Sequence, residues 1–139
     1  MSLCCLAGPL PAGEAVWLTS LPQAKTQAAK EKKLVMLDFT GSDWCGWCMK
    51  LKDEVFSKPK FADYAEKNLV LVEVDFPHSK SLPDSLKAAN NALMDKYGVS
   101  GFPTLVVMKP DGTVVWKQAG YLAGGPEAMI AKLDGAKQK

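Results

Sequence analysis

Two continuous apolar stretches stand out along the chain, at residues 34–39 and 69–74, and each contains a single acidic residue. Runs of this length without polar alternation are typical of strands that are buried on both faces, as in parallel sheets. A third apolar run at 105–108 is followed by the turn sequence Pro110-Asp111-Gly112 and a further segment at 113–117. Together these predict a β-hairpin.

Helix-like segments separate the predicted strands. We expect helices at residues 20–33, 45–56, from Pro59 onward, from position 83 or 84 to 97, and from about 126 to 133. Ser20 is a suitable N-cap for the first of them, and Gly98 follows the fourth as a stop signal. Short loops are expected at 40–44 and 76–82. This order predicts an α/β domain with a mixed sheet covered on both faces.

Composition narrows the possible functions. A chain of 139 residues with 47% hydrophobic residues fits one domain with a real core. All 17 basic residues are lysine, and they nearly balance the 15 acidic ones. Without arginine there are no bidentate guanidinium contacts to phosphates or bases, so nucleic acid is not an expected partner. No apolar run is long enough to span a bilayer.

Residues 1–15 differ in character from the rest of the chain. They are mostly apolar and small, broken by proline and glycine, and end in a Gly-Glu-Ala pattern compatible with signal-peptidase cleavage after Ala15. We therefore expect a signal-peptide remnant or an added tail at 1–15, a domain at 16–139, and a periplasmic or otherwise exported protein. The adjacent cysteines at positions 4 and 5 leave a lipid anchor open as an alternative.

Cys45 and Cys48 lie at the predicted start of a helix, directly after the first buried strand. Residues three apart share one helix face, with Cβ atoms about 5–6 Å apart, and can form a disulfide with little backbone movement. The free N–H groups at a helix start favour an anion, so the pKa of the Cys45 thiol is expected below about 8.5. Cys45 would attack a partner disulfide, and Cys48, expected to be the more buried, would resolve the mixed disulfide.

Two other uses of the pair have to be weighed. A zinc site needs about four ligands, and this pair supplies two. The only histidine, His78, lies in a loop where a solvated side chain is expected, so we expect no metal. A purely structural disulfide closing so small a loop would restrain the unfolded chain little. Because electrons can travel through the cysteines themselves, no dissolved cofactor is expected.

Several short segments carry a family resemblance. They are Asp38-Phe39, Trp44-Cys45-Gly46-Trp47-Cys48, Gly101-Phe102-Pro103-Thr104 and Asp111-Gly112. Together they resemble the thioredoxin superfamily over about residues 17–133, and the cysteine segment is most similar to bacterial proteins related to the periplasmic domains of thiol–disulfide interchange proteins. The resemblance implies a thioredoxin fold, with a central mixed sheet of four or five strands flanked by about four helices.

The resemblance also implies roles for residues outside the cysteine pair. Pro103 would be a cis-proline facing the cysteines, and Phe102 and Pro103 would offer free backbone groups to an extended substrate segment. Trp44, Gly46 and Trp47 would line the substrate groove, with Trp44 shielding the first cysteine. Trp47 stands where thioredoxins generally have proline.

Asp38 resembles the family's buried aspartate beneath the second cysteine. Burial would raise the pKa of its carboxyl and suit it to take a proton from Cys48. The alternative is a strand-end acid bonded to backbone. Asp38 lies seven residues before Cys45, one more than in typical thioredoxins. The family's neighbouring strand lysine is expected to be replaced by an apolar residue near Leu71.

These observations predict a thiol–disulfide oxidoreductase that reduces protein disulfides. Its partners would be protein disulfide substrates and a protein electron donor, for which a membrane-embedded protein is one option, and the protein would be a monomer. A disulfide oxidase or isomerase, and a non-catalytic binding domain of the same fold, stay open as alternatives. Residues 76–93 form a longer segment than in small thioredoxins, either for partner recognition or as a tolerated insertion.

Overall fold

The computed structural model describes residues 14–139. The leader expected at residues 1–15, including the two cysteines at positions 4 and 5, falls almost wholly outside this range. That expectation therefore stays a prediction.

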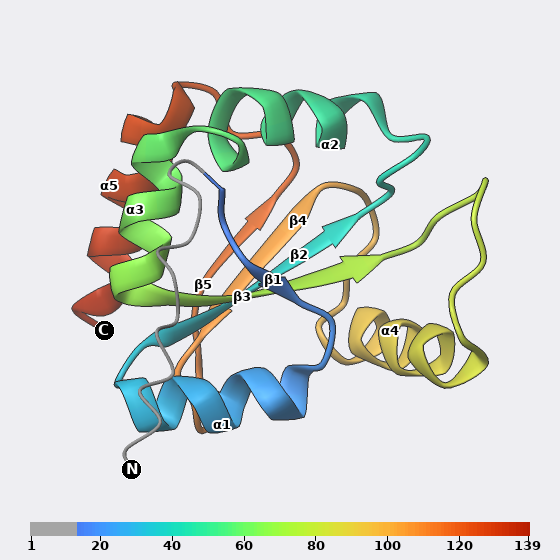
Figure 1. Cartoon of the computed structure of the whole chain (residues 1–139), viewed down its shortest axis with the longest axis horizontal. Coiled ribbons are helices and arrows are strands. Elements are labelled where there is room, and N and C mark those ends of the chain that lie inside the picture. The colour runs from blue at the N-terminus through green and yellow to red at the C-terminus, as the bar shows by residue number, and fades with distance from the viewer. Residues whose placement is uncertain (1–13) are drawn as a thin grey trace, which may run out of the picture.

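A five-stranded sheet forms the centre of the molecule (Figure 1). Its strands are β1 (Trp17–Leu18), β2 (Leu34–Thr40), β3 (Leu69–Asp75), β4 (Thr104–Met108) and β5 (Val114–Ala119). In the order β1-β3-β2-β4-β5, β3 is parallel to both β1 and β2, whereas β2–β4 and β4–β5 are antiparallel. Strand β1 was not expected, because two residues are too few to show a pattern.

Helices cover both faces of the sheet. They are α1 (Leu21–Glu31), α2 (Gly46–Leu51), the π-helical turn η1 (Lys52–Phe56), α3 (Pro59–Asn68), α4 (Asp84–Lys96) and α5 (Gly125–Lys137). Helices α1 and α4 lie on one face, and α2, α3 and α5 lie on the other (Figure 1). The expected thioredoxin fold with a mixed sheet is confirmed, with five α-helices in the described chain.

Side-chain alternation along the two central strands divides the core into two layers. Val35, Leu37 and Phe39 of β2 pack with α1, whereas Met36 packs with η1, α3 and α5 on the opposite face. Successive residues of a strand point to opposite faces. Asp38 therefore points to the same face as Met36, toward α2 and the cysteines.

The helix expected at 45–56 changes its winding halfway. After α2, the N–H of Ser57 donates to the carbonyl of Lys52 at 2.8 Å, five residues back, which defines the wider turn η1. Such turns inside helices are often found near functional sites. Here the wider turn lies beside the cavity described below.

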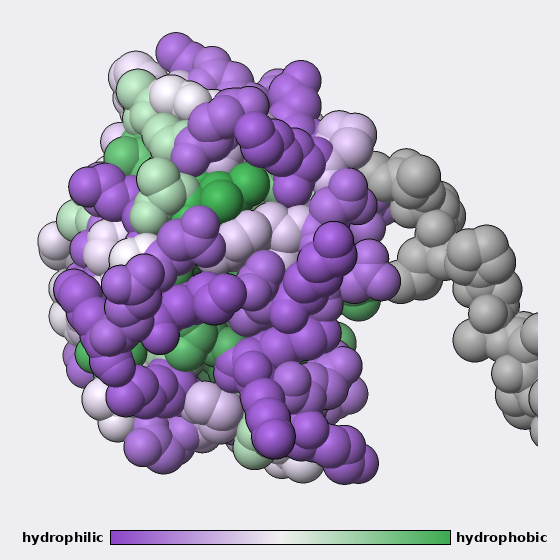
Figure 2. Space-filling model, turned by 90° about the vertical axis from the view of Figure 1, so that its left-hand side faces the viewer, coloured by the Kyte–Doolittle hydropathy of each residue, from purple (hydrophilic) through white to green (hydrophobic). Residues whose placement is uncertain are grey.

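The outer face formed by α3 and α5 is largely hydrophilic (Figure 2). Two polar contacts join the helices across it, from Lys60 to Glu127 at 3.2 Å and from the Tyr64 hydroxyl to Asp134 at 2.7 Å. Among the described helices, none combines the length and the apolar character that crossing a membrane would require.

Candidate active site

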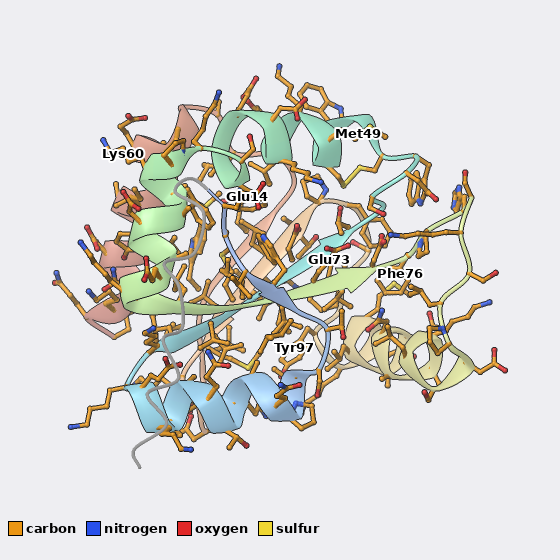
Figure 3. The ribbon with its side chains drawn as sticks, in the orientation of Figure 1. Glu14, Met49, Lys60, Glu73, Phe76 and Tyr97 are labelled. Atoms are coloured by element: carbon orange, nitrogen blue, oxygen red, sulfur yellow. A yellow bond between two sulfur atoms is a disulfide. The ribbon has the colours of Figure 1, made fainter. Side chains whose placement is uncertain are left out.

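The two cysteines of the central segment are joined in a disulfide at the start of α2, with Cα atoms 5.2 Å apart (Figure 3). Cys45 is the N-cap residue of α2, and its Sγ accepts a hydrogen bond from the N–H of Cys48 at 3.2 Å. This is the position expected to favour a thiolate. In the disulfide form the two residues are almost equally covered, at 7% and 6% exposed, so the expected greater burial of Cys48 is not found.

The loop between β2 and α2 is held at two points. The Asp75 carboxylate accepts hydrogen bonds from the N–H and hydroxyl of Ser42, at 3.0 and 2.5 Å. The Asp43 carboxylate accepts from the N–H groups of His78 at 2.9 Å and Ser79 at 2.7 Å. The hydrogen bond from His78 contributes most to lowering the pKa of Asp43. This loop, with its one additional residue, is thus tied both to the end of β3 and to the segment that follows it.

Trp44 forms one rim of the disulfide site. Its Nε1 donates to the carbonyl of Phe76 at 2.7 Å, and its ring stacks on the imidazole of His78, with centroids 4.4 Å apart and planes 5° from parallel. The ring of Phe102 meets it edge-on at 5.7 Å. His78 is exposed, as expected for a loop residue, but its place against Trp44 was not anticipated from the sequence.

Gly41 is the residue that lets this indole lie so close to the loop. A Cβ at position 41 would lie 2.6 Å from both Cζ2 and Nε1 of Trp44. Gly41→Ala is therefore expected to push the indole away and lower the free energy of unfolding by about 1–3 kcal/mol. Urea unfolding measures the loss, and near-UV circular dichroism reports the displaced tryptophan.

Gly135→Ala is the matched control for that substitution. Gly135 lies in α5, where an added Cβ meets no atom within 4 Å and alanine is the better helix former. Its stability should stay equal or rise. An unchanged stability in Gly41→Ala would show that the close packing of Trp44 on the loop is wrong.

Trp47 forms the opposite rim together with residues that were not anticipated. Trp47 is 57% exposed, and its ring centroid lies 5.2 Å from that of Tyr121, which follows β5. The Lys50 ammonium lies 5.2 Å from the centroid of each ring, within cation–π range. The hydroxyl of Tyr121 contacts the carboxylate of Glu54. Trp47 is therefore held by an exposed aromatic and charged cluster.

The segment before β4 agrees with one part of the resemblance and corrects another. The Phe102–Pro103 peptide bond is cis, as implied. The Pro103 carbonyl, however, accepts the N–H of Gly120 at 2.8 Å, and proline has no N–H of its own. Pro103 thus lacks a free backbone group. Within residues 14–139 no hydrogen bond involves the backbone of Phe102. Of these two residues, only Phe102 therefore keeps its N–H and its carbonyl free.

A cavity of about 390 Å³ lies beneath the disulfide and is lined by Cys48 and Asp38, among others. Asp38 is 8% exposed, and within the described residues its Oδ1 has no hydrogen-bond partner. Burial, and then the charges of Glu73 and Asp75, raise its pKa to about 8. The expected buried carboxyl with a raised pKa is therefore found, and it is not bonded to backbone.

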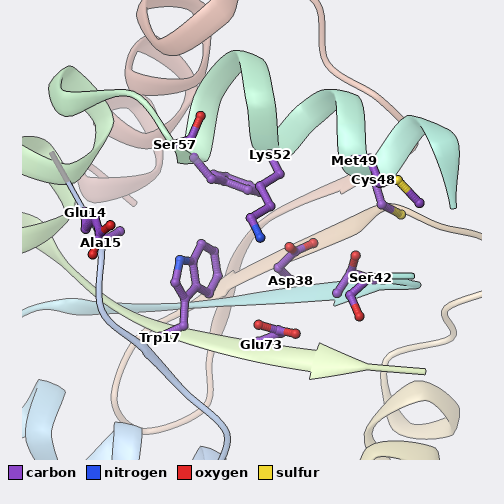
Figure 4. Close-up of a pocket in the computed structure, with 12 residues that line it drawn as sticks. Glu14, Ala15, Trp17, Asp38, Ser42, Cys48, Met49, Lys52, Ser57 and Glu73 are labelled. Carbon is purple, nitrogen blue, oxygen red and sulfur yellow. The ribbon is translucent and has the colours of Figure 1, made fainter. Parts of the chain in front are cut away.

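The strand residue opposite Asp38 is Glu73, and not an apolar residue near Leu71. In the parallel pairing of β2 with β3, Leu71 lies opposite Met36, and Glu73 lies two residues further along, opposite Asp38. The expectation was wrong because it depends on the register of two strands. The cavity thus contains a second carboxyl, and Lys52 of η1 is the lysine that lines it (Figure 4).

Nothing in residues 14–139 brings together three or more histidine, cysteine, aspartate or glutamate side chains that could hold a metal ion. Cys45 and Cys48 bond to each other, and the imidazole of His78 packs on Trp44.

A dithiol at the start of a helix, on a mixed sheet of this order, defines a thioredoxin-fold redox protein. The model of the thioredoxin-like domain family matches residues 21–137, and the chain belongs to this family.

Sequence and structure comparisons agree on the kind of relative. The chain is 34% identical over 128 residues to the disulfide bond reductase DsbH of Chlamydia pneumoniae, covering 92% of this chain and 76% of that protein. It is 29% identical to the thioredoxin-related protein DsbJ of the same organism, covering 73% of this chain and 29% of DsbJ. A solved DsbH oxidoreductase structure superposes with a TM-score of 0.85, at 32% identity, over 96% of this chain and 92% of that one.

The fold, the dithiol and these relatives together make the chain a thiol–disulfide oxidoreductase. This confirms the expected class of enzyme. A thioredoxin from Thermus thermophilus, at 20% identity and a TM-score of 0.59, shares the fold.

Proposed function

We propose that the protein reduces protein disulfides outside the cytoplasm, with Cys45 as nucleophile and Cys48 as resolving residue. One observation supports the roles given to the two cysteines. Cys45 caps α2, and its sulfur already accepts the N–H of Cys48. In the reduced protein this N–H would stabilise the thiolate of Cys45, since hydrogen bonding to the charged form lowers a pKa.

The proposed reaction passes two electrons to the substrate. The thiolate of Cys45 attacks one sulfur of a substrate disulfide, and the second substrate sulfur leaves as a thiolate that takes a proton from solvent. Cys48 then loses its proton and attacks the Sγ of Cys45, so that the first substrate sulfur leaves with the electron pair. A protein donor must return two electrons to the Cys45–Cys48 disulfide before the next cycle.

The substrate is proposed to be an extended segment lying between the two aromatic rims. Trp44 and Phe102 border the groove on one side and Trp47 on the other, with Gly46 between the tryptophans in the chain. The free backbone groups of Phe102 would pair with the segment as a short strand. A monomer suffices for this arrangement, and no dissolved cofactor takes part in the proposed reaction. An exported location is proposed because disulfides persist outside the reducing cytosol.

The direction of electron flow can be measured by equilibrating the Cys45–Cys48 couple with glutathione. For a reductase we expect a potential more negative than about −200 mV, closer to thioredoxin at about −270 mV than to DsbA at about −120 mV. A value near −120 mV would assign the protein as an oxidase and overturn the reductive direction, while leaving the roles of the cysteines intact.

A further inference from the structure

We propose that Glu73 is a positioning residue for the redox reaction. It forms a carboxyl pair with Asp38, and the pair takes up the proton that Cys48 releases and passes it to solvent through the cavity beneath the disulfide. The proposal deepens the function proposed above and depends on it.

The pairing of β2 with β3 brings the two carboxyls together. Asp38 and Glu73 lie opposite each other in adjacent parallel strands, and neighbouring strands of a sheet are about 4.8 Å apart. Both residues line the cavity that Cys48 also lines. In Figure 4 the two side chains project from neighbouring strands into the same space, with Lys52 reaching toward them from the helix above.

The two carboxyls differ in their access to water. Asp38 is almost fully buried, with one oxygen unpartnered, whereas Glu73 is only half-buried. The cavity of about 390 Å³ has room for water, because about 10–15 Å³ of such space is enough for one molecule. Asp38 is thus the inner group of the proton path and Glu73 the outer group. The cavity leaves room for water between these carboxyls and solvent.

The surrounding charges place the proton on the inner carboxyl. The charged groups that act on the pair are Lys52 of η1, Asp75 of β3 and Lys80 of the following loop, whereas Glu14 lines the far end of the cavity (Figure 4). Asp75 is engaged by Ser42 and by Lys80, the latter at 3.4 Å. Burial, and then the charge of Asp75, raise the pKa of Glu73, and Lys80 and Lys52 oppose that rise. Burial, and then the charges of Glu73 and Asp75, let Asp38 keep its proton to about pH 8.

The proton step belongs to the resolving attack. The step takes place in molecules whose Asp38 is ionised, a fraction that grows as the pH approaches 8. The S–H bond of Cys48 breaks, its proton goes to the Asp38 carboxylate, and its electron pair forms the bond to Cys45 Sγ. The bond from Cys45 to the substrate sulfur breaks, and that sulfur leaves as a thiolate. Asp38 then passes the proton through the cavity toward Glu73 and solvent, which regenerates the base. No electrons other than those of the dithiol are involved.

Glu73 acts in this step through its charge on Asp38. A carboxylate next to Asp38 disfavours its ionised form, so the proton is held until the pH is higher. The rate of the resolving step is expected to rise with pH as Asp38 ionises, and its midpoint is the pH at which this rise is half complete. Glu73→Gln removes that charge and should move this midpoint down by about one pH unit. Glu73→Lys, which reverses the charge, should move it down by about two units. Glu73→Asp should restore the wild-type midpoint.

The test measures single-turnover reduction of a peptide disulfide by the reduced full chain, from pH 5 to 9. The readout is release of the substrate sulfur that was bonded to Cys45, which reports the resolving step. Glu66→Gln, an exposed carboxyl of α3, is the matched control and should keep the wild-type profile. In an Asp38→Asn background, Glu73→Gln should shift nothing further, because the effect passes through Asp38.

The outcomes separate the two proposals. If Glu73→Gln and Glu73→Asp both keep the wild-type midpoint, the proposed role of the carboxyl pair is wrong, and the proposed dithiol function is unaffected. This conclusion does not require Glu73→Lys to fold. A shift by Glu73→Gln that persists in the Asp38→Asn background would also overturn the pair. If Cys45→Ser still reduces the peptide, the proposed function itself fails, whatever Glu73 does.

Discussion

Replacing Cys45 with serine is expected to lower disulfide reduction to the uncatalysed background. A hydroxyl stays protonated near neutral pH and cannot form a disulfide with the substrate sulfur, so the first step of the reaction is lost. The N-cap hydrogen bond can still form, because serine is a good N-cap residue. We therefore expect the fold to survive and the activity to vanish. Insulin reduction with dithiothreitol as donor measures the effect.

Cys48→Ser is the matched comparison at the second sulfur. It leaves Cys45 able to attack but removes the group that releases the substrate, so a covalent mixed disulfide should accumulate. A non-reducing gel or intact-mass measurement would detect the adduct, and dithiothreitol should reduce the mixed disulfide and release the substrate. Insulin reduction by Cys45→Ser at the wild-type rate, or an adduct that forms without Cys45, would contradict the assigned roles.

The central strands could be predicted because their signal is local. Residues 34–39 and 69–74 are apolar almost throughout, and both became strands with nearly the expected bounds. Strand β1 has only two residues and is held by pairing with β3, at Trp17 opposite Leu71. The wider turn η1 also had no signal, since residues 52–56 read equally well as ordinary helix. Both features depend on the neighbours that pack against them.

The candidate site was predictable where a motif carries it. Cys45, Cys48 and the cis-proline follow from short segments, whereas His78 and Tyr121 reach the tryptophans through the conformations of distant loops. Glu73 also has a signal in the sequence, which lies in its position within the second apolar run.

Each buried run contains one acid, and in each it is the fifth residue. Parallel strands that begin in register, as Leu34 and Leu69 do, must place those two acids side by side.

Asp38 should also govern how the stability of the oxidised protein depends on pH. Its pKa is about 8 in the folded protein, against an ordinary value of 3.8. Below about pH 4 the carboxyl is neutral in both states, and it affects folding little. Between pH 4 and 8 the unfolded chain releases the proton and the folded protein keeps it. The folded state then binds more protons, so the free energy of unfolding falls as the pH rises and levels off above about 8.

Asp38→Asn removes this dependence, because asparagine is neutral throughout. The variant should match the wild-type stability more closely near pH 4 and exceed it increasingly toward pH 8, by on the order of 5 kcal/mol. Urea unfolding of the disulfide form, in which the two cysteines do not titrate, measures the difference across this range. Asp63→Asn, an exposed change on α3, controls for the loss of a carboxyl as such.

A wild-type advantage over Asp38→Asn that stays constant from pH 4 to 8 would mean that Asp38 is ionised in the folded protein. A carboxylate already ionised below pH 7 would be a weaker base for the proton of Cys48, so the same titration tests the chemistry of the resolving step.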